Sequence, residues 1–448
     1  MQSSKETLTG RARSEQLVQT SLEGISSKAN RDKDYRFRDL YRQINYEALK
    51  LAWEKINKKA ALGVDEVTTE EFAKNLDENL TKILDSLKGK RYHAKLVRRK
   101  YIAKKNGKKR PLGIPALSDK IVQRAAADIL EAIFEQDFIA ESYGYRPNKS
   151  AKTAVKDLSK ELQFGRYNYI VEADIKGFFD NINHDWLVKM LEQRINDKQF
   201  IRLIKKWLKA GILEEDGEVI HPVTGTPQGS IISPILANIY LHYVLDIWFK
   251  GVVKKQSQED AYICRYADDY VCAFKYKRDA ERFYQKMQKR LKKFALELSL
   301  KKTNIIPFSR FKEESSSFEF LGFEFRWEKS RKGTDIVKRR TSRKKLKKSL
   351  KNFTKWCKAN RDKRLRTLFK KLNSKLRGYY NYYGIIGNYD SLQKFFKISL
   401  DILYKWINRR SQRKSMNKKK FEEILGWYDI CEPRITERKD NQLKFQFA

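Results

Sequence analysis

The chain has 448 residues, of which 34% are charged and 41% hydrophobic, so it is long enough for two or three globular domains and too apolar to be disordered. Its 97 Lys and Arg residues outnumber 56 Asp and Glu residues, and the net charge of +41 predicts a polyanionic partner. The four cysteines lack paired metal-ligand spacing, and no run of about 18 apolar residues occurs. These features exclude a zinc site, a disulfide framework and a membrane span, and we expect a cytoplasmic protein.

The N-terminal part of the sequence predicts helices followed by a basic hairpin. Residues 1–34 are polar with little apolar periodicity, and we expect a flexible basic arm there. Apolar residues recur at helical spacing over 37–56 and 70–87. The period changes over 92–114, which predicts two strands joined by a tip rich in Lys and Arg at 104–110. Such a tip is either solvated or grips a triphosphate, because Lys and Arg suit phosphate oxygens.

A strand that ends in an acid follows a second helix-rich stretch over 118–162. The strand has a period of two from residue 169 and runs into Asp174, and Gly177 interrupts it. A carboxylate at a strand end is a good candidate for a catalytic acid. Asp180 lies beyond the interruption and is expected to cap the helix that begins near 183.

Two further segments have the residues of a nucleotide and metal site. A glycine-bounded loop over 225–230 opens a long apolar helix and offers free backbone N–H groups to a phosphate. Strand-forming residues over 262–274 flank Asp268 and Asp269, which predicts a β-hairpin with two acids at its tip. Taken alone, this pair is either a solvated turn or a cation site, because adjacent like charges repel unless a cation stabilises them.

The C-terminal part becomes strongly basic. A helix over 279–296 and a strand over 304–308 precede a strictly alternating aromatic segment at 318–325, which predicts a strand or hairpin. Basic helices are expected beyond 331, and residues 338–420 have 29 Lys and Arg and three acids, a net charge of +26. Each helix has one apolar stripe and a cationic remainder, which favours a nucleic-acid surface over a solvated one. Interleaved tyrosines are expected to stack on RNA bases, namely Tyr379, Tyr380, Tyr382 and Tyr383.

In chain order these segments resemble the reverse transcriptase motif series. The matching segments are Arg110-Pro-Leu-Gly-Ile-Pro115, Ala173-Asp174 with Phe178-Phe179, Thr226-Pro-Gln-Gly-Ser230, Tyr266-Ala-Asp-Asp269, Leu300-Lys-Lys-Thr303 and Phe320-Leu-Gly-Phe323. Segments 372–383 and 409–415 are similar to the maturase domain of bacterial group II intron-encoded proteins, so the resemblance spans about 37–435. A fingers-side turn departs from the family pattern as Gly63-Val-Asp-Glu66, and no paired cysteines of an H-N-H endonuclease are found.

The resemblance implies an α+β right-hand polymerase fold followed by a basic helical maturase domain. The implied parts are a flexible basic arm at 1–34, an N-terminal extension and fingers at 35–165, a palm with the catalytic core and an antiparallel sheet at 166–328, a helical thumb at 329–383 and a maturase or DNA-binding region at 384–448.

The resemblance also implies the site residues. Two Mg²⁺ ions are expected on Asp174, Asp268 and Asp269, with the backbone carbonyl of Ile175 as an extra ligand, and Asp268 is expected to be the stricter of the paired acids. The implied nucleotide-binding residues are Lys104, Lys108, Arg110, Ile175, Phe179 under the sugar, Gln228 and Lys302. The implied primer and template residues are Tyr266, Gly229, Phe320, Leu321 and Gly322. The implied RNA-binding residues are Lys344, Lys345, Lys347, Lys348, Arg377, Arg409 and Arg410.

The implied function is an RNA-directed DNA polymerase that is also a maturase. It is expected to bind group II intron RNA to promote splicing and to copy it from a DNA target, using dNTPs, an RNA template and a DNA or RNA primer. One alternative is an RNA-binding splicing factor without polymerase activity, which the intact Asp174, Gln228 and Asp268 disfavour. Another is a reverse transcriptase repurposed for defence, a CRISPR-linked role or repair.

Overall fold

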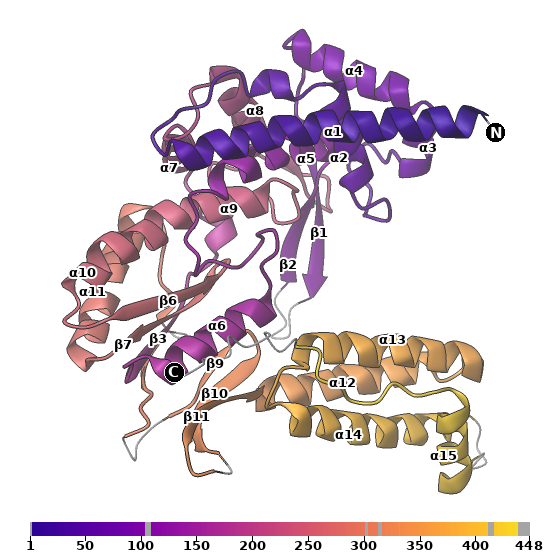
Figure 1. Cartoon of the computed structure of the whole chain (residues 1–448). Helices are drawn as coiled ribbons and strands as arrows, with labels where there is room; N and C mark the ends of the chain where they lie inside the picture. The colour runs from indigo at the N-terminus through magenta and orange to yellow at the C-terminus, as the bar shows by residue number, and fades with distance from the viewer. Residues whose placement is uncertain are drawn as a thin grey trace.

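A helical layer occupies the top of the molecule in Figure 1. This computed structural model describes residues 2–103, 109–300, 303–311, 316–330, 332–410 and 416–437. The layer contains α1 (Gln2–Arg31), the 3-10 turn η1 (Tyr41–Gln43), α2 (Tyr46–Lys55), α3 (Thr69–Lys74), α4 (Leu76–Lys88), α5 (Leu117–Phe134), α7 (His184–Leu191) and α8 (Lys198–Leu208). Helix α5 lies at its centre, because α1 and α2 both pack against it and most of its side chains are buried.

The N-terminal segment, for which a flexible arm over 1–34 is predicted, is helical over Gln2–Arg31, and the later part of this helix packs against the core. Residues Gln2–Arg31 form α1, and Ala29 near its end is fully buried. The buried guanidinium of Arg194 donates hydrogen bonds to the carbonyl oxygens of Ala29 and Asp32, both at 2.9 Å. Local apolar periodicity cannot reveal hydrogen bonds between residues so far apart in the sequence. For this reason the sequence predicted an arm.

The single helix predicted over 70–87 is two helices. Asn75 has a non-helical backbone conformation and separates α3 from α4. A capping box at Thr68 and Glu71 starts α3, because each side chain binds the backbone N–H of the other. Both helices still place their apolar residues on one side, so the predicted periodicity was right and the continuity was wrong.

The predicted basic hairpin descends from this layer. Strands β1 (Val97–Ala103) and β2 (Lys109–Ile114) pair antiparallel, and the segment 104–108 between them lies outside the described residues. Strand β1 also pairs with β4 (Ile212–Leu213), which pairs with β5 (Val219–Ile220). The resulting sheet has the order β2-β1-β4-β5 and connects the helical layer to the centre of the molecule.

A second four-stranded sheet forms the centre of the molecule. Its antiparallel order is β6-β7-β3-β8, built from β3 (Tyr169–Asp174), β6 (Ala261–Tyr266), β7 (Asp269–Phe274) and β8 (Asn304–Pro307). Alternate residues of β3 and β7 belong to two different hydrophobic cores, one shared with α11 (Lys277–Lys293) and one with α6 (Ala151–Phe164). The sheet is therefore covered on both faces and presents its functional residues at its end.

The loop after β3 corrects one prediction. Asp180 ends the 3-10 turn η2 (Phe178–Asp180) and does not cap the next helix. Asn183 is the cap of α7, because its side chain accepts a hydrogen bond from the backbone N–H of Trp186 at 3.0 Å. Gly177 permits the break before η2 with a left-handed φ of 55°.

The predicted long apolar helix is present and contains two wide turns. It begins as α9 (Ser233–Leu241), continues through the π-helical turns η3 (His242–Asp246) and η4 (Phe249–Val253), and ends as α10 (Lys254–Gln256). It packs between α7 and α5 on one side of the central sheet. None of the helices in the described ranges is both long and apolar enough to cross a membrane.

The basic C-terminal region begins with strands. The alternating aromatic segment forms the hairpin β9 (Phe318–Phe320) and β10 (Phe323–Lys329), and β11 (Asp335–Thr341) joins it where helix was expected. Helices α12 (Arg343–Asn360), α13 (Leu365–Tyr383), α14 (Tyr389–Ile407) and α15 (Lys418–Trp427) follow and project to the right in Figure 1. One hydrophobic core spans residues 353–430, so the boundary predicted at 383/384 lies inside a single packed unit.

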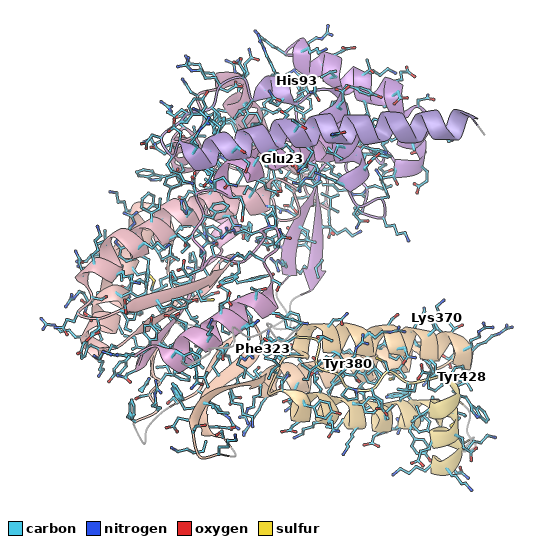
Figure 2. All side chains as sticks on the ribbon, in the orientation of Figure 1. Glu23, His93, Phe323, Lys370, Tyr380 and Tyr428 are labelled. Atoms are coloured by element: carbon cyan, nitrogen blue, oxygen red, sulfur yellow. The ribbon has the colours of Figure 1, made fainter. Side chains whose placement is uncertain are left out.

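The tyrosine cluster of α13 is mainly core, which corrects the expectation that all four rings stack on RNA. Tyr380 is fully buried, and Tyr379 stacks on Phe395 with a centroid distance of 3.6 Å. Tyr382 and Tyr383 pack on Phe323 of β10 at 5.9 Å and 5.3 Å. These rings join the helices to the strands, so their spacing in the sequence reflects packing. Figure 2 labels Phe323 and Tyr380 at this junction.

Candidate active site

The register of the central sheet brings the three predicted acids together. Asp174 is the last residue of β3 and pairs directly with Asp269, the first residue of β7. Tyr266 pairs with Asp269 across the hairpin, so Ala267 and Asp268 form a two-residue turn, with Ala267 at a φ of 56°. The acids therefore converge from two neighbouring strands, as expected of the hairpin tip.

The electrostatics of these acids suit a cation. Asp269 keeps exposed surface, yet shielding of its carboxylate from bulk water and the charges of neighbouring acids together raise its pKa to about 7. Among those acids Asp268 and Asp174 contribute most to the rise, and the charge of Lys345 opposes it. Within the described residues, no group of three Asp, Glu, His or Cys side chains is arranged so that it could hold a metal ion. The unrelieved repulsion at Asp269 is the observation that fits a cation here, because a positive ion would stabilise all three charged forms.

A buried ionic network fixes the hairpin that contains the acids. Arg265 of β6 and Asp246 of η3 have no exposed side-chain surface, and they pair through Nε–Oδ1 at 2.8 Å and Nη2–Oδ2 at 2.5 Å. Arg265 Nη1 also donates to Asn238 Oδ1 at 3.0 Å and to the carbonyl of Ala267 at 3.1 Å. The guanidinium therefore holds the turn next to Asp268 from inside. Sequence reasoning missed this network, although an Arg inside an apolar strand and an Asp inside an apolar helix were its signal.

The glycine-bounded loop lies against the basic hairpin. The N–H of Gly113 donates to the carbonyl of Gln228 at 2.6 Å, and Arg110 Nε donates to Gln228 Oε1 at 2.8 Å. Gly229 has a φ of 109°, and a Cβ there would lie 2.7 Å from the Gly113 carbonyl oxygen, so only glycine fits. Two residues predicted to bind the nucleotide, Arg110 and Gln228, are thus in direct contact. Lys104, Lys108 and Lys302 lie outside the described residues.

Comparisons with known proteins agree with this arrangement. The family model for reverse transcriptase (RNA-dependent DNA polymerase) matches residues 102–325. The group II intron-encoded protein LtrA of Lactococcus lactis subsp. cremoris is 32% identical over an alignment that covers 84% of this chain and 75% of LtrA. The chain belongs to the group II intron-encoded reverse transcriptase and maturase family.

Other relatives match shorter parts of the chain. Protein YkfC of Escherichia coli (strain K12) is 35% identical over 48% of this chain and 63% of its own length. A solved structure of apo telomerase from Candida tropicalis, truncated from its C-terminal domain, has a TM-score of 0.41 at 17% identity and covers 52% of this chain and 53% of that chain.

Family membership establishes the activity and confirms the α+β fold. The chain is an RNA-directed DNA polymerase with a maturase function, and its partners include an RNA template and other nucleic acids. Reverse transcriptases generally depend on Mg²⁺. The sheet β6-β7-β3-β8 is the palm sheet of this reverse transcriptase, and we use that term below.

Two predicted site residues next to Asp174 are buried. The side chain of Ile175 is 2% exposed, and its backbone forms an isolated bridge with Leu298. Phe179 is 7% exposed and packs edge-on against Phe178 at 5.4 Å. The carbonyl of Phe179 accepts a hydrogen bond from the N–H of Thr226 at 2.8 Å, so the 3-10 turn after β3 is tied to the Gln228 loop. Phe179 is therefore a core residue that borders the Gln228 loop.

The predicted primer residues form a tight turn that α12 and α13 hold. Leu321 and Gly322 lie between β9 and β10 with φ values of 49° and 83°, and Phe320 beside them is buried. The hydroxyl of Tyr382 donates to the Leu321 carbonyl at 2.9 Å, and the N–H of Ser342 donates to the Gly322 carbonyl at 3.0 Å. The turn is therefore attached to the helical C-terminal region and to the palm at the same time.

The basic residues at the start of α12 lie close to the palm. Lys344 is 86% exposed in its side chain and is 3.7 Å from Glu319 of β9. The Cγ atom of Lys345 would lie 3.4 Å from a Cβ added to Gly322, so the stem of Lys345 covers the turn of Leu321 and Gly322. Lys347 is exposed and Lys348 is partly exposed on the same helix. These side chains are available to a nucleic-acid backbone.

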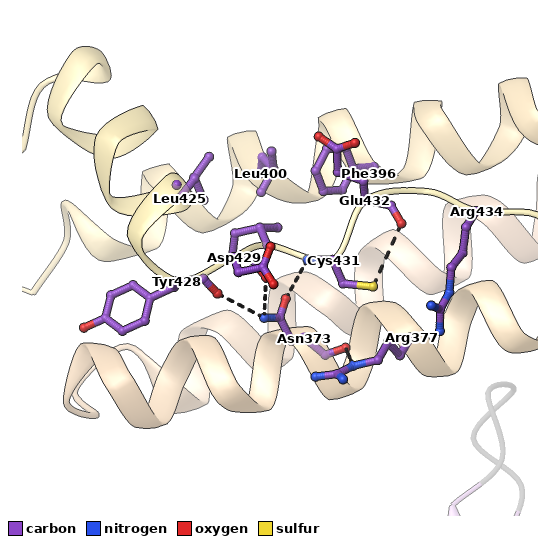
Figure 3. Close-up of a pocket in the computed structure, with 12 residues that line it drawn as sticks. Asn373, Arg377, Phe396, Leu400, Leu425, Tyr428, Asp429, Cys431, Glu432 and Arg434 are labelled. Carbon is purple, nitrogen blue, oxygen red and sulfur yellow. Dashed lines mark hydrogen bonds between the residues drawn. The ribbon is translucent and has the colours of Figure 1, made fainter.

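The other predicted RNA-binding residues have different surroundings. Arg377 and Arg434 lie on the wall of a pocket of about 790 Å³ between α13, α14 and the chain after α15, shown in Figure 3. Arg409 is exposed, with its guanidinium 5.3 Å from the ring centroid of Trp406. Arg410 donates to the Lys363 carbonyl at 2.9 Å and so connects the end of α14 to the loop before α13. Part of the Arg410 side chain is therefore structural.

Proposed function

We propose that Asp174, Asp268 and Asp269 hold two Mg²⁺ ions, with the backbone carbonyl of Ile175 as a further ligand. The observation that supports this most is the pairing of Asp174 with Asp269 across β3 and β7, with Asp268 in the adjoining turn. Three carboxylates suffice, because Mg²⁺ prefers hard oxygen ligands and keeps several waters. When bound, the two ions activate the primer 3′-hydroxyl and stabilise the leaving pyrophosphate. Asp268 is the stricter ligand and Asp269 the more tolerant one.

The basic hairpin β1–β2 and the loop over 225–230 bind the incoming dNTP, across from the three acids of the palm sheet. Arg110 contacts the triphosphate with its forked guanidinium, and its hydrogen bond to Gln228 Oε1 supports this by orienting both side chains. Lys104 and Lys108 assist at the triphosphate, and Lys302 provides a countercharge to the pyrophosphate. Phe179 lies under the sugar and excludes a 2′-hydroxyl.

The primer end and the template are held by residues around the hairpin tip. Tyr266 and Gly229 contact them near the acids, and the turn of Phe320, Leu321 and Gly322 supports the primer terminus. The hydrogen bonds from Tyr382 and Ser342 to this turn support the assignment, because a primer support must be rigid.

The basic helices bind RNA along its backbone. We assign the fingers to 35–165 and the palm to 166–328. Within the single packed C-terminal unit, we assign the thumb function to 329–383 and the maturase or DNA-binding function to 384–448. Their cations contact group II intron RNA for splicing, and the polymerase copies that RNA from a cleaved DNA target in the cytoplasm, at the nucleoid. The charge of +26 over 338–420 supports this, because phosphate neutralisation supplies most of such affinity.

Substitution of single acids tests the metal site. Asp174→Asn and Asp268→Asn are expected to lower Mg²⁺-dependent cDNA synthesis by about 10³-fold or more, because each removes a charged metal ligand. Primer extension on an RNA template measures this, and filter binding with intron RNA at the same protein concentration is expected to be unchanged. Full extension by either variant would contradict the assignment.

Asp260→Asn is the matched control for this experiment. Asp260 directly precedes β6 at the opposite end of the same hairpin, and its side chain is 76% exposed beside Lys254. The variant loses the same charge from the same hairpin and is expected to extend primers normally.

A further inference from the structure

Tyr145 has an unusual conformation close to the active site. It lies in the loop between α5 and α6, its side chain is 49% exposed, and its φ is 57°. The left-handed region costs free energy for every residue with a Cβ, and glycine would adopt it without that cost. A large exposed aromatic residue in this conformation indicates a function that outweighs the cost.

Both neighbours of Tyr145 are anchored. A Cβ on Gly144 would lie 2.3 Å from the backbone nitrogen of Ala267, so the loop touches the turn that contains Asp268. Asn238, a member of the buried Arg265 network, donates to the Gly144 carbonyl at 2.7 Å. On the other side, Arg146 forms a two-point contact with Glu135 at 2.7 Å and 3.0 Å.

These anchors connect Tyr145 to the catalytic turn through one rigid unit. The same Asn238 side chain that holds Gly144 accepts a hydrogen bond from Arg265, and Arg265 holds the Ala267 carbonyl. The network therefore fixes the position of Tyr145 relative to Asp268 without any bond to the Tyr145 side chain. Within the described residues, the Tyr145 hydroxyl itself makes no hydrogen bond.

The charged groups that face the Tyr145 phenol belong to the two halves of the active site. Partial shielding from water and the neighbouring charge of Asp268 raise its pKa, and the charge of Arg110 lowers it. Tyr266 of β6 also raises the pKa of Tyr145. The charges of Asp268, in the proposed metal site, and of Arg110, in the proposed triphosphate site, thus both reach the Tyr145 phenol, and the loop that contains Tyr145 touches the turn of Asp268.

We propose that Tyr145 is a further substrate-binding residue that contacts the incoming dNTP, with its hydroxyl donating to a phosphate or sugar oxygen and its ring packing on the sugar. This inference rests on the proposed function, because it takes Arg110 and Asp268 as the ends of the nucleotide site. A primer contact would instead place the ring at the turn of Leu321 and Gly322, to which the hydroxyl of Tyr382 is bonded.

Tyr145→Gly is the most informative variant, because glycine relieves the left-handed backbone while it removes the ring. Its Tm is expected to stay within about 3 °C of the parent protein. In primer extension on an RNA template, its KM for dNTP is expected to rise about 10-fold, and Tyr145→Phe about 3-fold, because one hydrogen bond is lost. The Kd for primer–template is expected to be unchanged in both.

Asn148→Gly is the matched control, since Asn148 lies in the same loop, is exposed and has a φ of 58°. This variant is expected to keep the parent KM. An unchanged KM in Tyr145→Gly would overturn the proposal, as would a loss of primer–template affinity with a normal KM. A large fall in the Tm of Tyr145→Gly would also overturn the proposal, because it would show that Tyr145 has a structural role.

The failure of this inference can be distinguished from the failure of the proposed function. If Asp268→Asn is inactive and Tyr145→Gly has a normal KM, only the role of Tyr145 is wrong. If Asp268→Asn extends primers normally, the metal assignment is wrong, and a raised KM for dNTP in Tyr145→Gly would still support the nucleotide contact of Tyr145.

Discussion

The palm hairpin and the C-terminal helices α12–α15 place their charges in opposite environments. In the palm, Arg265 and Asp246 are completely buried and paired with each other. In the C-terminal region, the core is apolar and the cations are outside, with Lys344 86% exposed. Both regions are nevertheless proposed to bind nucleic acid.

The difference follows from what each contact requires. Chemistry at a phosphorus atom requires carboxylates held in place, and a buried, fully bonded guanidinium provides that rigidity. Contact with an RNA backbone requires positive charge along a surface, and exposed flexible Lys and Arg side chains provide it. We therefore expect substitutions in the palm network to change stability and geometry, and substitutions on α12 to change affinity and its salt dependence.

The largest effect is expected from breaking the buried pair. Arg265→Met leaves Asp246 charged in the interior with only the His242 ring, 3.9 Å from its Oδ2, beside it, which should reduce the free energy of unfolding by about 3–5 kcal/mol. Urea denaturation measures this. Burial raises the pKa of the Asp246 carboxyl, but Arg265 and His242 together lower it more, so the pKa lies below its usual range. These partners therefore stabilise the fold above the usual Asp pKa, and the stabilisation is lost as pH falls through the lower folded pKa.

The double variant Arg265→Met with Asp246→Leu is the control for the buried pair. It removes both charges together, so most of the lost stability should return. If the single variant were as stable as the parent, the pair would not anchor the hairpin, and the contrast between the two regions would fail.

An intermediate effect is expected at Phe179. Phe179→Val should reduce the free energy of unfolding by about 1–3 kcal/mol, because the side chain is 93% buried. If its ring also lies under the sugar, the variant should incorporate ribonucleotides more readily, measured as the ratio of kcat/KM for dNTP and rNTP. Unchanged sugar selectivity together with lost stability would assign Phe179 to the core alone.

A smaller, salt-dependent effect is expected on α12. Replacing three lysines by Gln should weaken intron RNA binding about 10-fold and reduce the slope of log K against log salt by about 2 units, because fewer counterions are released. Binding titrations at several salt concentrations measure this. The lysines are Lys344, Lys347 and Lys348.

The matched control removes the same charge from the exposed face of α11, on the far side of the palm sheet in Figure 1. The residues are Lys289, Lys292 and Lys293. Equal losses of affinity and slope in both triple variants would mean that net charge, and not the α12 surface, determines RNA binding.

The smallest effect is a pH dependence at Asp269. Its pKa of about 7 in the metal-free protein exceeds the usual Asp value, so the folded state binds more protons between about pH 4 and 7. The contribution of Asp269 to stability should therefore fall as pH rises through this window. Tm measured against pH in EDTA should show a weaker fall in Asp269→Asn, and added Mg²⁺ should reduce the fall in the parent protein.

Local patterns predicted the elements whose residues repeat regularly. The alternation over 318–325 predicted the β9–β10 hairpin, and the acids at 268 and 269 predicted the palm hairpin tip. Strand β11 was missed because its Lys and Arg residues resemble the basic helices that follow. The break at Asn75 was missed because the apolar spacing continues across it.

The sequence by itself determined the family and the acids of the site, because motif order along the chain does not depend on folding. Only the tertiary structure decided which charges are buried and which rings are core. Arg265 meets Asp246 and Asn238 from a different element, and Tyr379 meets Phe395 from the next helix. Such partners depend on how elements pack, and a pattern within one element does not contain that information. For the same reason, Tyr145 became a candidate only when the structure placed its loop against the turn that contains Asp268.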